Sequence, residues 1–258
     1  MDKEERKVEA FKKYLKNYDI TQDRIALKVR HTYGVVEFSE WIARKLELEE
    51  EDVELAKLIA YLHDIGRFEQ AKQYDDFTDG EKMDHAQYGV KILFEEGLIR
   101  DFITEDKFDN IIYKAIFNHN RYKIEEGLNP RELLHAKIIR DSDKLDNFQI
   151  KQTQSFYTLY RKTEEEVSKQ FISEKVYESF LQHQCILSAD RKTDLDHWIS
   201  ILGFIYDLNF KISYKYLYQE DAIFKLVDRI SYQQEDTKKK MEEIKKVANQ
   251  FLENKLKE

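Results

Sequence analysis

Residues 56–68 read AKLIAYLHDIGRF, and this stretch decides the fold class. The apolar residues around its start recur at the spacing of one helical face: Leu55, Leu58, Ile59 and Leu62. The pattern predicts a helix over about 51–65 with that face buried. Gly66 stands where a left-handed C-terminal cap would end such a helix, and residues 67–83 are then expected to form a loop.

The composition of the 258-residue chain favours helix throughout. One proline and seven glycines are few for the many tight turns that a sheet protein needs. Lys and Glu are abundant, and both residues favour helix. The predicted fold is therefore all-α.

Charge and cysteine usage exclude several classes of protein. The formal charge of −8 and the absence of an evident basic face argue against broad nucleic-acid binding. The charged N-terminus lacks the apolar core of a signal peptide, and no run of about 18 apolar residues exists to span a membrane. The single cysteine, Cys185, cannot build a disulfide framework or a thiolate zinc site. A cytoplasmic location is expected.

Amphipathic patterns predict helices along the rest of the chain. Asn129-Pro130 marks the clearest start, because an N-cap precedes a proline at the first helical position and Glu132 is placed for a capping box. The other helices are expected near 4–17, 21–46, 84–97, 104–120, 149–162, 166–183, 190–218 and 233–257, and the helix from 129 ends near 147. The last helix either docks on the body or pairs with a second subunit in a homodimer, through Met241, Ile244, Ala248 and Phe251.

Four histidines lie on or beside buried helical stripes: His31, His63, His85 and His119. Each alone is more often a structural histidine than a ligand. Together they bring eight ring nitrogens into a core, where each needs a partner, and a divalent metal supplies such partners. Asp64 adds a carboxylate whose two oxygens could serve one metal while leaning towards a second. His63 and Asp64 point about 100° apart on a helix, so they converge only at its end, where the negative pole favours a cation.

The segment RDSDKLDNF, residues 140–148, offers one more carboxylate ligand. Asp141 and Asp143 point about 200° apart on a helix and cannot both face one metal. Asp146 shares a face with Asp143, so the residues alone do not choose between these two. The alternative is that two of the three aspartates are solvated.

At this point the sequence resembles the HD-domain metal-dependent phosphohydrolase superfamily. The resemblance covers roughly residues 24–150 and rests on five blocks in order: VRHTYGVVEF (29–38), LHDIGRFEQ (62–70), DHAQYGVKIL (84–93), AIFNHN (115–120) and RDSDKLDNF (140–148). It implies a compact HD-domain helical bundle with additional C-terminal helices. We expect residues 1–165 to form the HD-type metal-binding domain and residues 166–258 to pack on it as an extension, the two together making one structural unit.

The resemblance also implies the roles of particular residues. It implies metal ligands at His31, His63, Asp64 and Asp143, with a second metal held by two further histidines, His85 and His119. His85 can instead assist catalysis in members with one metal. Imidazole and carboxylate ligands suit Mn, Fe, Co, Ni or Zn, as one ion or two. Water activated by the metal would hydrolyse a phosphoester or phosphoanhydride, with Asp64, His85 and Lys144 as catalytic residues.

Positive charge near the motifs is expected to hold the substrate. Matching lysines bind phosphate in parts of the family, which implies this role for Lys144. Arg67, Lys82 and Arg121 also lie next to the motifs, and Arg67 stands where several nucleotide triphosphohydrolases have another histidine. The GYP signature of the cyclic-dinucleotide phosphodiesterase branch is absent. Asp146 is expected to orient a ligand or Lys144.

Three hypotheses follow. The first is an enzyme that hydrolyses a nucleotide or another small phosphorylated metabolite. The second is a non-catalytic module, stabilised by metal, that senses a nucleotide or binds a protein. The third is an incidental cluster that binds no metal. Substrate specificity would come from residues 67–83 and from the region after residue 148.

Overall fold

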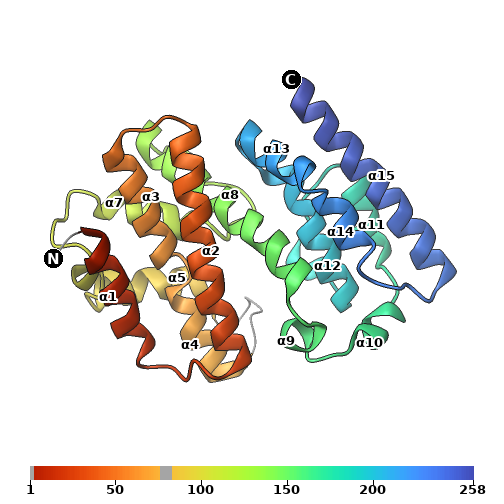
Figure 1. Ribbon diagram of the computed structural model, residues 1–258, viewed down its shortest axis with the longest axis horizontal. Helices are drawn as coiled ribbons and strands as arrows, with labels where there is room; N and C mark the ends of the chain where they lie inside the picture. Colours follow the sequence, from red (N-terminus) through yellow and green to blue (C-terminus); the bar gives the residue numbers. More distant parts are fainter. Residues whose placement is uncertain (1–2, 76–82) are drawn as a thin grey trace. The chain divides into compact units, whose positions relative to one another are not determined.

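The computed structural model describes residues 3–75 and 83–258 (Figure 1). Over these two ranges the chain forms helices and connecting segments and no strand, which confirms the prediction of an all-α fold. Within them, no helix combines the length and the apolar character needed to cross a membrane. The chain divides into two compact units, Met1–Asp143 and Lys144–Glu258, so the division falls inside one helix, α8 (Pro130–Thr153).

The first unit is built around α2 and α3, which pack along each other. Its core contains side chains that are fully buried, among them Phe11, Leu62, Phe68, Ile112 and Ile116. The helices before α8 are α1 (Lys3–Leu15), α2 (Asp23–Lys45), α3 (Glu50–Leu62), α4 (Ile65–Tyr74), α5 (His85–Val90), a π-helical turn (Lys91–Glu95), α6 (Ile99–Phe102) and α7 (Asp109–Asn118). Their apolar faces meet in one cluster, as the helical stripes of the sequence predict.

The structure corrects the prediction around Gly66. Gly66 lies inside α4 rather than at a left-handed cap, and residues 67–74 of the predicted loop continue that helix. A Cβ added at Gly66 would lie 2.1 Å from the carbonyl oxygen of His85 and 2.8 Å from the amide nitrogen of Gly89. Glycine is therefore required because α4 and α5 touch backbone to backbone. Residues 76–82 of the predicted loop, Lys82 among them, lie outside the described residues.

The predicted start of α8 is confirmed. The Asn129 side-chain oxygen accepts hydrogen bonds from the amides of Arg131 and Glu132 at 3.0 Å each, and the Glu132 carboxylate accepts from the amide of Asn129 at 2.9 Å. This reciprocal pair is a capping box, and Pro130, the first residue of the helix, directly follows Asn129. The helix continues past its predicted end at residue 147 to Thr153.

In the second unit, the predicted long helices are broken into shorter ones. The capping box of Thr193 with Asp196 starts a new helix inside the range 190–218, which was predicted to be continuous. A second capping box, Thr163 with Glu166, starts a short helix between the predicted ranges 149–162 and 166–183. The elements are α9 (Phe156–Tyr160), α10 (Glu164–Ser168), α11 (Glu174–Leu181), a 3₁₀ turn (Ser188–Asp190), α12 (Asp194–Leu202), a second 3₁₀ turn (Gly203–Asp207), α13 (Lys211–Gln219), α14 (Ala222–Val227) and α15 (Glu235–Lys257). Local capping outweighs the weak helical periodicity of this region.

The last helix, α15, docks within the second unit against α11, α13 and α14 (Figure 1). Met241, Ile244 and Ala248 are buried there, as is Leu252. Phe251, also predicted on this face, packs its ring against Tyr206 at 4.9 Å between centroids. The apolar side of α15 is thus used inside the unit. The predicted homodimer and the packing of residues 166–258 on residues 1–165 stay predictions.

Candidate metal centre

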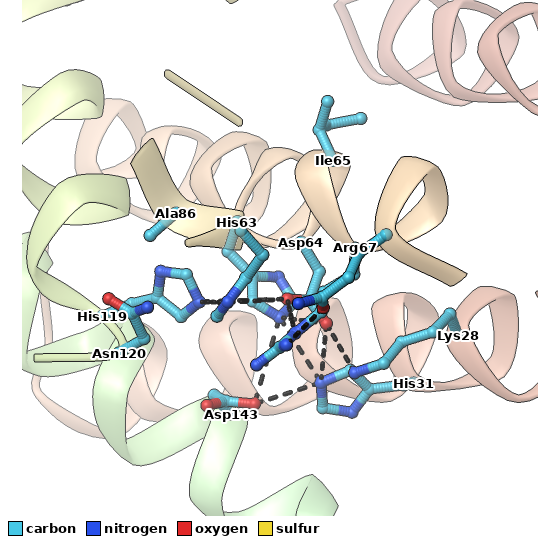
Figure 2. Close-up of polar contacts among 12 residues, drawn as sticks. Lys28, His31, His63, Asp64, Ile65, Arg67, Ala86, His119, Asn120 and Asp143 are labelled. Carbon is cyan, nitrogen blue, oxygen red and sulfur yellow. Dashed lines mark hydrogen bonds and ion pairs between the residues drawn. The ribbon is translucent and has the colours of Figure 1, made fainter. Parts of the chain in front are cut away.

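Six side chains that the sequence analysis singled out come together in the first unit. Figure 2 labels all of them except His85. They arrive from five places in the chain: His31 in α2, His63 and Asp64 between α3 and α4, His85 at the start of α5, His119 just after α7, and Asp143 in α8. The four histidines and Asp64 are each less than 5% exposed. Five separate segments therefore converge on one buried, polar point.

The Asp64 carboxylate lies at the middle of this cluster, where the dashed lines of Figure 2 meet. Its Oδ2 is 3.6 Å from Nε2 of His31 and 3.7 Å from Nε2 of His63. Its Oδ1 is 3.3 Å from Nε2 of His85 and 3.9 Å from Nε2 of His119. One carboxylate is thus shared by two groups of metal-type ligands, which we call the first group (His31, His63, Asp64) and the second group (Asp64, His85, His119).

Asp143 adds a second carboxylate to the first group. Its Oδ1 is 3.0 Å from Nε2 of His31 and 4.0 Å from Nε2 of His63. Asp141 and Asp146 are also buried, so the alternative that two of the three aspartates are solvated is wrong. Asp146 belongs to the second unit, and its predicted orienting role stays a prediction.

Backbone carbonyls fix how two of the histidines present their nitrogens. Nδ1 of His63 lies 2.7 Å from the carbonyl oxygen of Ala60, and Nδ1 of His119 lies 2.6 Å from that of Ile116. A carbonyl only accepts, so Nδ1 donates in both pairs and Nε2 is left with its lone pair towards the centre. This is the tautomer that a metal ligand needs, and a second hydrogen bond of this kind is typical of metal-binding histidines.

The spacing of the two histidine nitrogens in the first group fits a metal. Two atoms that each lie about 2.1 Å from one ion are separated by roughly 3–3.5 Å when the angle between them is near 90–110°. The first group, with Nε2 of His31 and of His63 3.4 Å apart, lies near that range. In the second group, Nε2 of His85 and of His119 are 2.8 Å apart, a hydrogen bond in which His85 donates because His119 presents a lone pair.

Comparison with known families identifies the fold of this region. Residues 29–147 match the sequence model of the HD domain, a span that contains all six side chains. Over these residues the chain is similar to the HD domain. Searches of the curated proteins and of the solved structures found no match. This match, together with the His/Asp cluster, indicates that this region binds a divalent metal.

Burial and charge keep the ligands of this region in their metal-binding forms. Burial, with His63 nearby, lowers the pKa of His119 to about 4, and burial also lowers the pKa of His63. Burial alone would raise the pKa of Asp64, but Lys28 and the surrounding imidazoles hold that pKa well below its usual range. At neutral pH His63 and His119 are therefore neutral and the Asp64 carboxylate is ionised, as metal binding requires.

Lys28 is the residue near the centre that the sequence analysis missed. Its Nζ lies 2.7 Å from Oδ2 of Asp64, and its side chain is mostly buried. Lys28 precedes His31 by three residues in α2, so helical spacing places the two on one face. The spacing of three residues from His31 could have identified Lys28. It did not single Lys28 out because Lys and Arg occur throughout this chain.

The three basic residues that were predicted to bind the substrate, Arg67, Arg121 and Lys144, have different neighbours in the structure. Nε of Arg67 is 3.7 Å from Oδ1 of Asp64, so Arg67 does lie at the centre. Nη1 of Arg121 is 3.3 Å from Oδ2 of Asp84, and the guanidinium stacks on Phe117. Lys144 belongs to the second unit, where its Nζ lies 2.8 Å from Oδ2 of Asp207. Their substrate-binding roles remain proposals.

The remaining histidines have structural partners or lie in the second unit. Nε2 of His135 is 2.8 Å from Oδ1 of Asp52, away from the six-residue cluster. His183 packs against Tyr206 and Phe251 in the second unit. His197 lies there as well, and burial, with Arg191 nearby, lowers its pKa to about 4. These contacts agree with the interpretation of all three as structural.

The buried histidines make the metal-free protein sensitive to acid. Unfolded His119 takes up a proton near pH 6.5, whereas the folded residue does so only near pH 4. Between these values the unfolded state binds more protons, so the free energy of unfolding falls as the pH falls, by roughly 3 kcal/mol from this residue. Urea unfolding of metal-stripped protein at pH 7, 5.5 and 4 measures the loss. His119→Gln should flatten the profile in this window, and an unchanged profile in the variant would contradict the assignment.

Proposed function

We propose that this protein is a metal-dependent phosphohydrolase that cleaves a phosphoester or phosphoanhydride of a nucleotide or another small phosphorylated metabolite. One observation carries the proposal: inside the region that is similar to the HD domain, the Asp64 carboxylate is shared by two pairs of buried histidines. A site that only stabilised the fold would need one closed set of ligands. Two groups around a common carboxylate are typical of centres that hold two ions for hydrolysis.

The residues present would hold Mn, Fe, Co, Ni or Zn, because their donors are imidazoles and carboxylates. His31, His63, Asp64 and Asp143 would bind one ion, and Asp64, His85 and His119 would bind a second. When bound, a divalent ion at this centre lowers the pKa of a water and neutralises negative charge on a phosphoryl group. The four histidines and Asp64 are almost fully buried, so bulk solvent is excluded from the centre.

The basic residues around Asp64 are placed to bind the phosphate. Lys28 approaches Oδ2 of Asp64 and Arg67 approaches Oδ1, so two cations flank the carboxylate that the ions would share. With a divalent ion held at Asp64, both side chains would be drawn less strongly to that carboxylate and would bind an anionic phosphoryl group instead. We therefore assign to Lys28 and Arg67 the binding and orientation of the phosphoryl oxygens. Lys144, held by Asp207, stays a proposed further contact.

The burial of the centre favours a small substrate. The side chains of Lys28 and Arg67 are each 14% exposed, so only a slender phosphate-bearing group reaches them. The chain has a formal charge of −8, which disfavours a polyanion such as a nucleic acid. A terminal or monoester phosphate on a nucleotide or a metabolite meets both conditions.

Metal analysis followed by a substrate screen on the same sample tests the proposal. Purified protein is analysed for bound metals, stripped, reloaded with each of the five metals and incubated with nucleotides and phosphoesters. Metal-dependent release of phosphate or pyrophosphate is expected. Tight nucleotide binding by calorimetry without turnover would instead support the non-catalytic module. Protein that binds none of the metals would overturn both the phosphohydrolase and the metal-stabilised module.

Lys28→Met is expected to weaken catalysis without removing metal. The change deletes one charge-assisted hydrogen bond to a phosphoryl oxygen, worth about 1.5–3 kcal/mol, so kcat/KM should fall roughly 10–100-fold. Metal content should be unchanged, because a competing cation next to Asp64 is removed rather than a ligand.

Lys57→Met is the matched control. Lys57 is also a buried lysine in the first unit, and it pairs with Glu54 at 3.2 Å and lies 3.8 Å from Glu40. Its replacement should lower stability and leave kcat/KM per folded molecule unchanged. Equal losses of kcat/KM in the two variants would show that Lys28 has no specific role.

A further inference from the structure

The loop that carries His119 is fastened to the start of α5 by the side chain of Asp84. Asp84 Oδ1 accepts hydrogen bonds from the amides of Ala86 and Gln87 at 3.0 Å each, which caps α5. The same oxygen accepts from Nδ2 of Asn120 at 3.2 Å, and Oδ2 pairs with Arg121 at 3.3 Å. One carboxylate thus joins the residue before His85 to the two residues after His119.

The other side of this loop is held by Arg140, a buried guanidinium in α8. Its Nη1 donates to the carbonyl oxygens of Asn118 at 2.7 Å and of Arg121 at 2.6 Å, with that of His119 at 3.4 Å. The end of a helix leaves carbonyls without partners within the helix, and a cation there also opposes the negative pole of the helix. Arg140 therefore fixes the backbone on both sides of His119.

His119 needs such support because it follows the last residue of α7, Asn118, and no helix begins after it until α8 at Pro130. Its place depends on contacts from other segments: Asp84 from one side and Arg140 from the other. The first group depends less on such contacts, since His31 lies in the middle of α2 and His63 lies between α3 and α4, which begins at Ile65. In addition, the first group includes Asp143 and has four protein ligands, whereas the second group has three.

We propose that Asp84 and Arg140 are positioning residues that set the affinity of the second group for its ion and leave the first group nearly unaffected. The inference rests on the proposed function in one respect, namely that both groups bind metal. Partners that orient the ligands of a metal typically contribute about 10–100-fold to its affinity. The second ion is therefore the more weakly held of the two, and its affinity depends on side chains that do not touch it.

Asp84→Ser separates this role from helix capping. Serine is a good N-cap, so α5 should still begin at His85, but a serine hydroxyl replaces the carboxylate that pairs with Arg121. Asp84 and Arg121 are 24% and 31% exposed, and a pair of this kind contributes at most about 1 kcal/mol to stability. A large change in metal affinity would therefore exceed anything that a merely structural role predicts.

The experiment is a calorimetric titration of metal-stripped full-length protein with Co²⁺ alone, together with elemental analysis. Wild-type protein should show two binding events. In Asp84→Ser, the tighter event should keep its affinity and the weaker event should be 10–100-fold weaker. The matched control is Asp109→Ser. Asp109 is another aspartate at the start of a helix, α7, and it pairs with an arginine, Arg100. Both events should be unchanged in the control.

Arg140 is tested with two substitutions. Arg140→Lys keeps the charge but replaces the planar fork with one amine, and it should weaken the second event selectively. Arg140→Met leaves buried carbonyls without their donor and should have the larger effect. If the methionine variant fails to fold, Asp84→Ser and Arg140→Lys decide the matter.

The outcomes are distinct. Two events of unchanged affinity in Asp84→Ser and Arg140→Lys would overturn this inference and leave the proposed function standing. A single event in wild-type protein would also overturn it, because the second group would then hold no ion. No Co²⁺ binding at all in wild-type protein would overturn the proposed function itself.

Discussion

Asp64→Asn is expected to release both ions and to lower turnover by about 10³-fold or more, since the ions contribute several kcal/mol to stabilising the transition state and 1.4 kcal/mol corresponds to a factor of ten. The reason is the position of the carboxylate, which faces His31 and His63 with one oxygen and His85 and His119 with the other. Asparagine keeps the shape but loses the charge and one of the two acceptor oxygens. Substitution of any single histidine removes a ligand from one group only.

Elemental analysis and turnover measure the effect, and circular dichroism verifies the fold. Asp52→Asn is the matched control, because Asp52 also pairs with a buried histidine of the first unit, His135 at 2.8 Å, and with Arg131 at 2.7 Å. That variant should keep its metal and its turnover. Two ions per chain in Asp64→Asn would show that the shared carboxylate does not hold them.

Gly66→Ala is expected to destabilise the first unit by about 3 kcal/mol or more, as overpacking of a tight contact does. The new Cβ would meet the carbonyl oxygen of His85 at 2.1 Å and the amide nitrogen of Gly89 at 2.8 Å. Both atoms belong to the backbone of α5 and cannot rotate away, so α4 and α5 must separate. Because His85 begins α5, the separation should also move a ligand of the second group.

Two other glycines provide a graded comparison in the same unfolding assay. At Gly89 the nearest atom to an added Cβ is the amide nitrogen of Gly66 at 3.4 Å, so Gly89→Ala should cost less. At Gly203 the nearest atom is 3.7 Å away and φ is −66°, which any residue adopts. Gly203→Ala should be neutral or stabilising by up to about 1 kcal/mol. Equal stability of Gly66→Ala and the wild type would refute the account of the contact between α4 and α5.

Local sequence was sufficient wherever a signal lies within one or two helical turns. The capping box at Asn129 and Glu132 was predicted and is present. The buried stripe before His63 was predicted and forms α3. In the second unit the same reasoning failed to divide the range 190–218, because it did not weigh the capping box of Thr193 with Asp196 against helical periodicity. That signal was local, and it was missed rather than absent.

The role of Gly66 illustrates what local sequence does not contain. A glycine after HDI has the pattern of a left-handed cap, and the pattern predicted the wrong conformation. What decides its conformation is the backbone of α5, which begins almost twenty residues later. Lys28 is a similar case, since nothing near it in the sequence distinguishes it from the other lysines until α2 places it beside Asp64.

By itself the sequence determined the helical character of the protein and five residues that share a chemistry, His31, His63, Asp64, His85 and His119, because helix propensity, periodicity and residue type are properties of short segments. The choice of Asp143 over Asp146 came from the resemblance to a family. The tertiary structure alone decided that Asp64 serves two groups, that Lys28 joins it and that Asp84 and Arg140 fasten the loop of His119. Each of these depends on distances between segments 20 to 80 residues apart, and such distances are fixed only when the apolar faces of all the helices pack together.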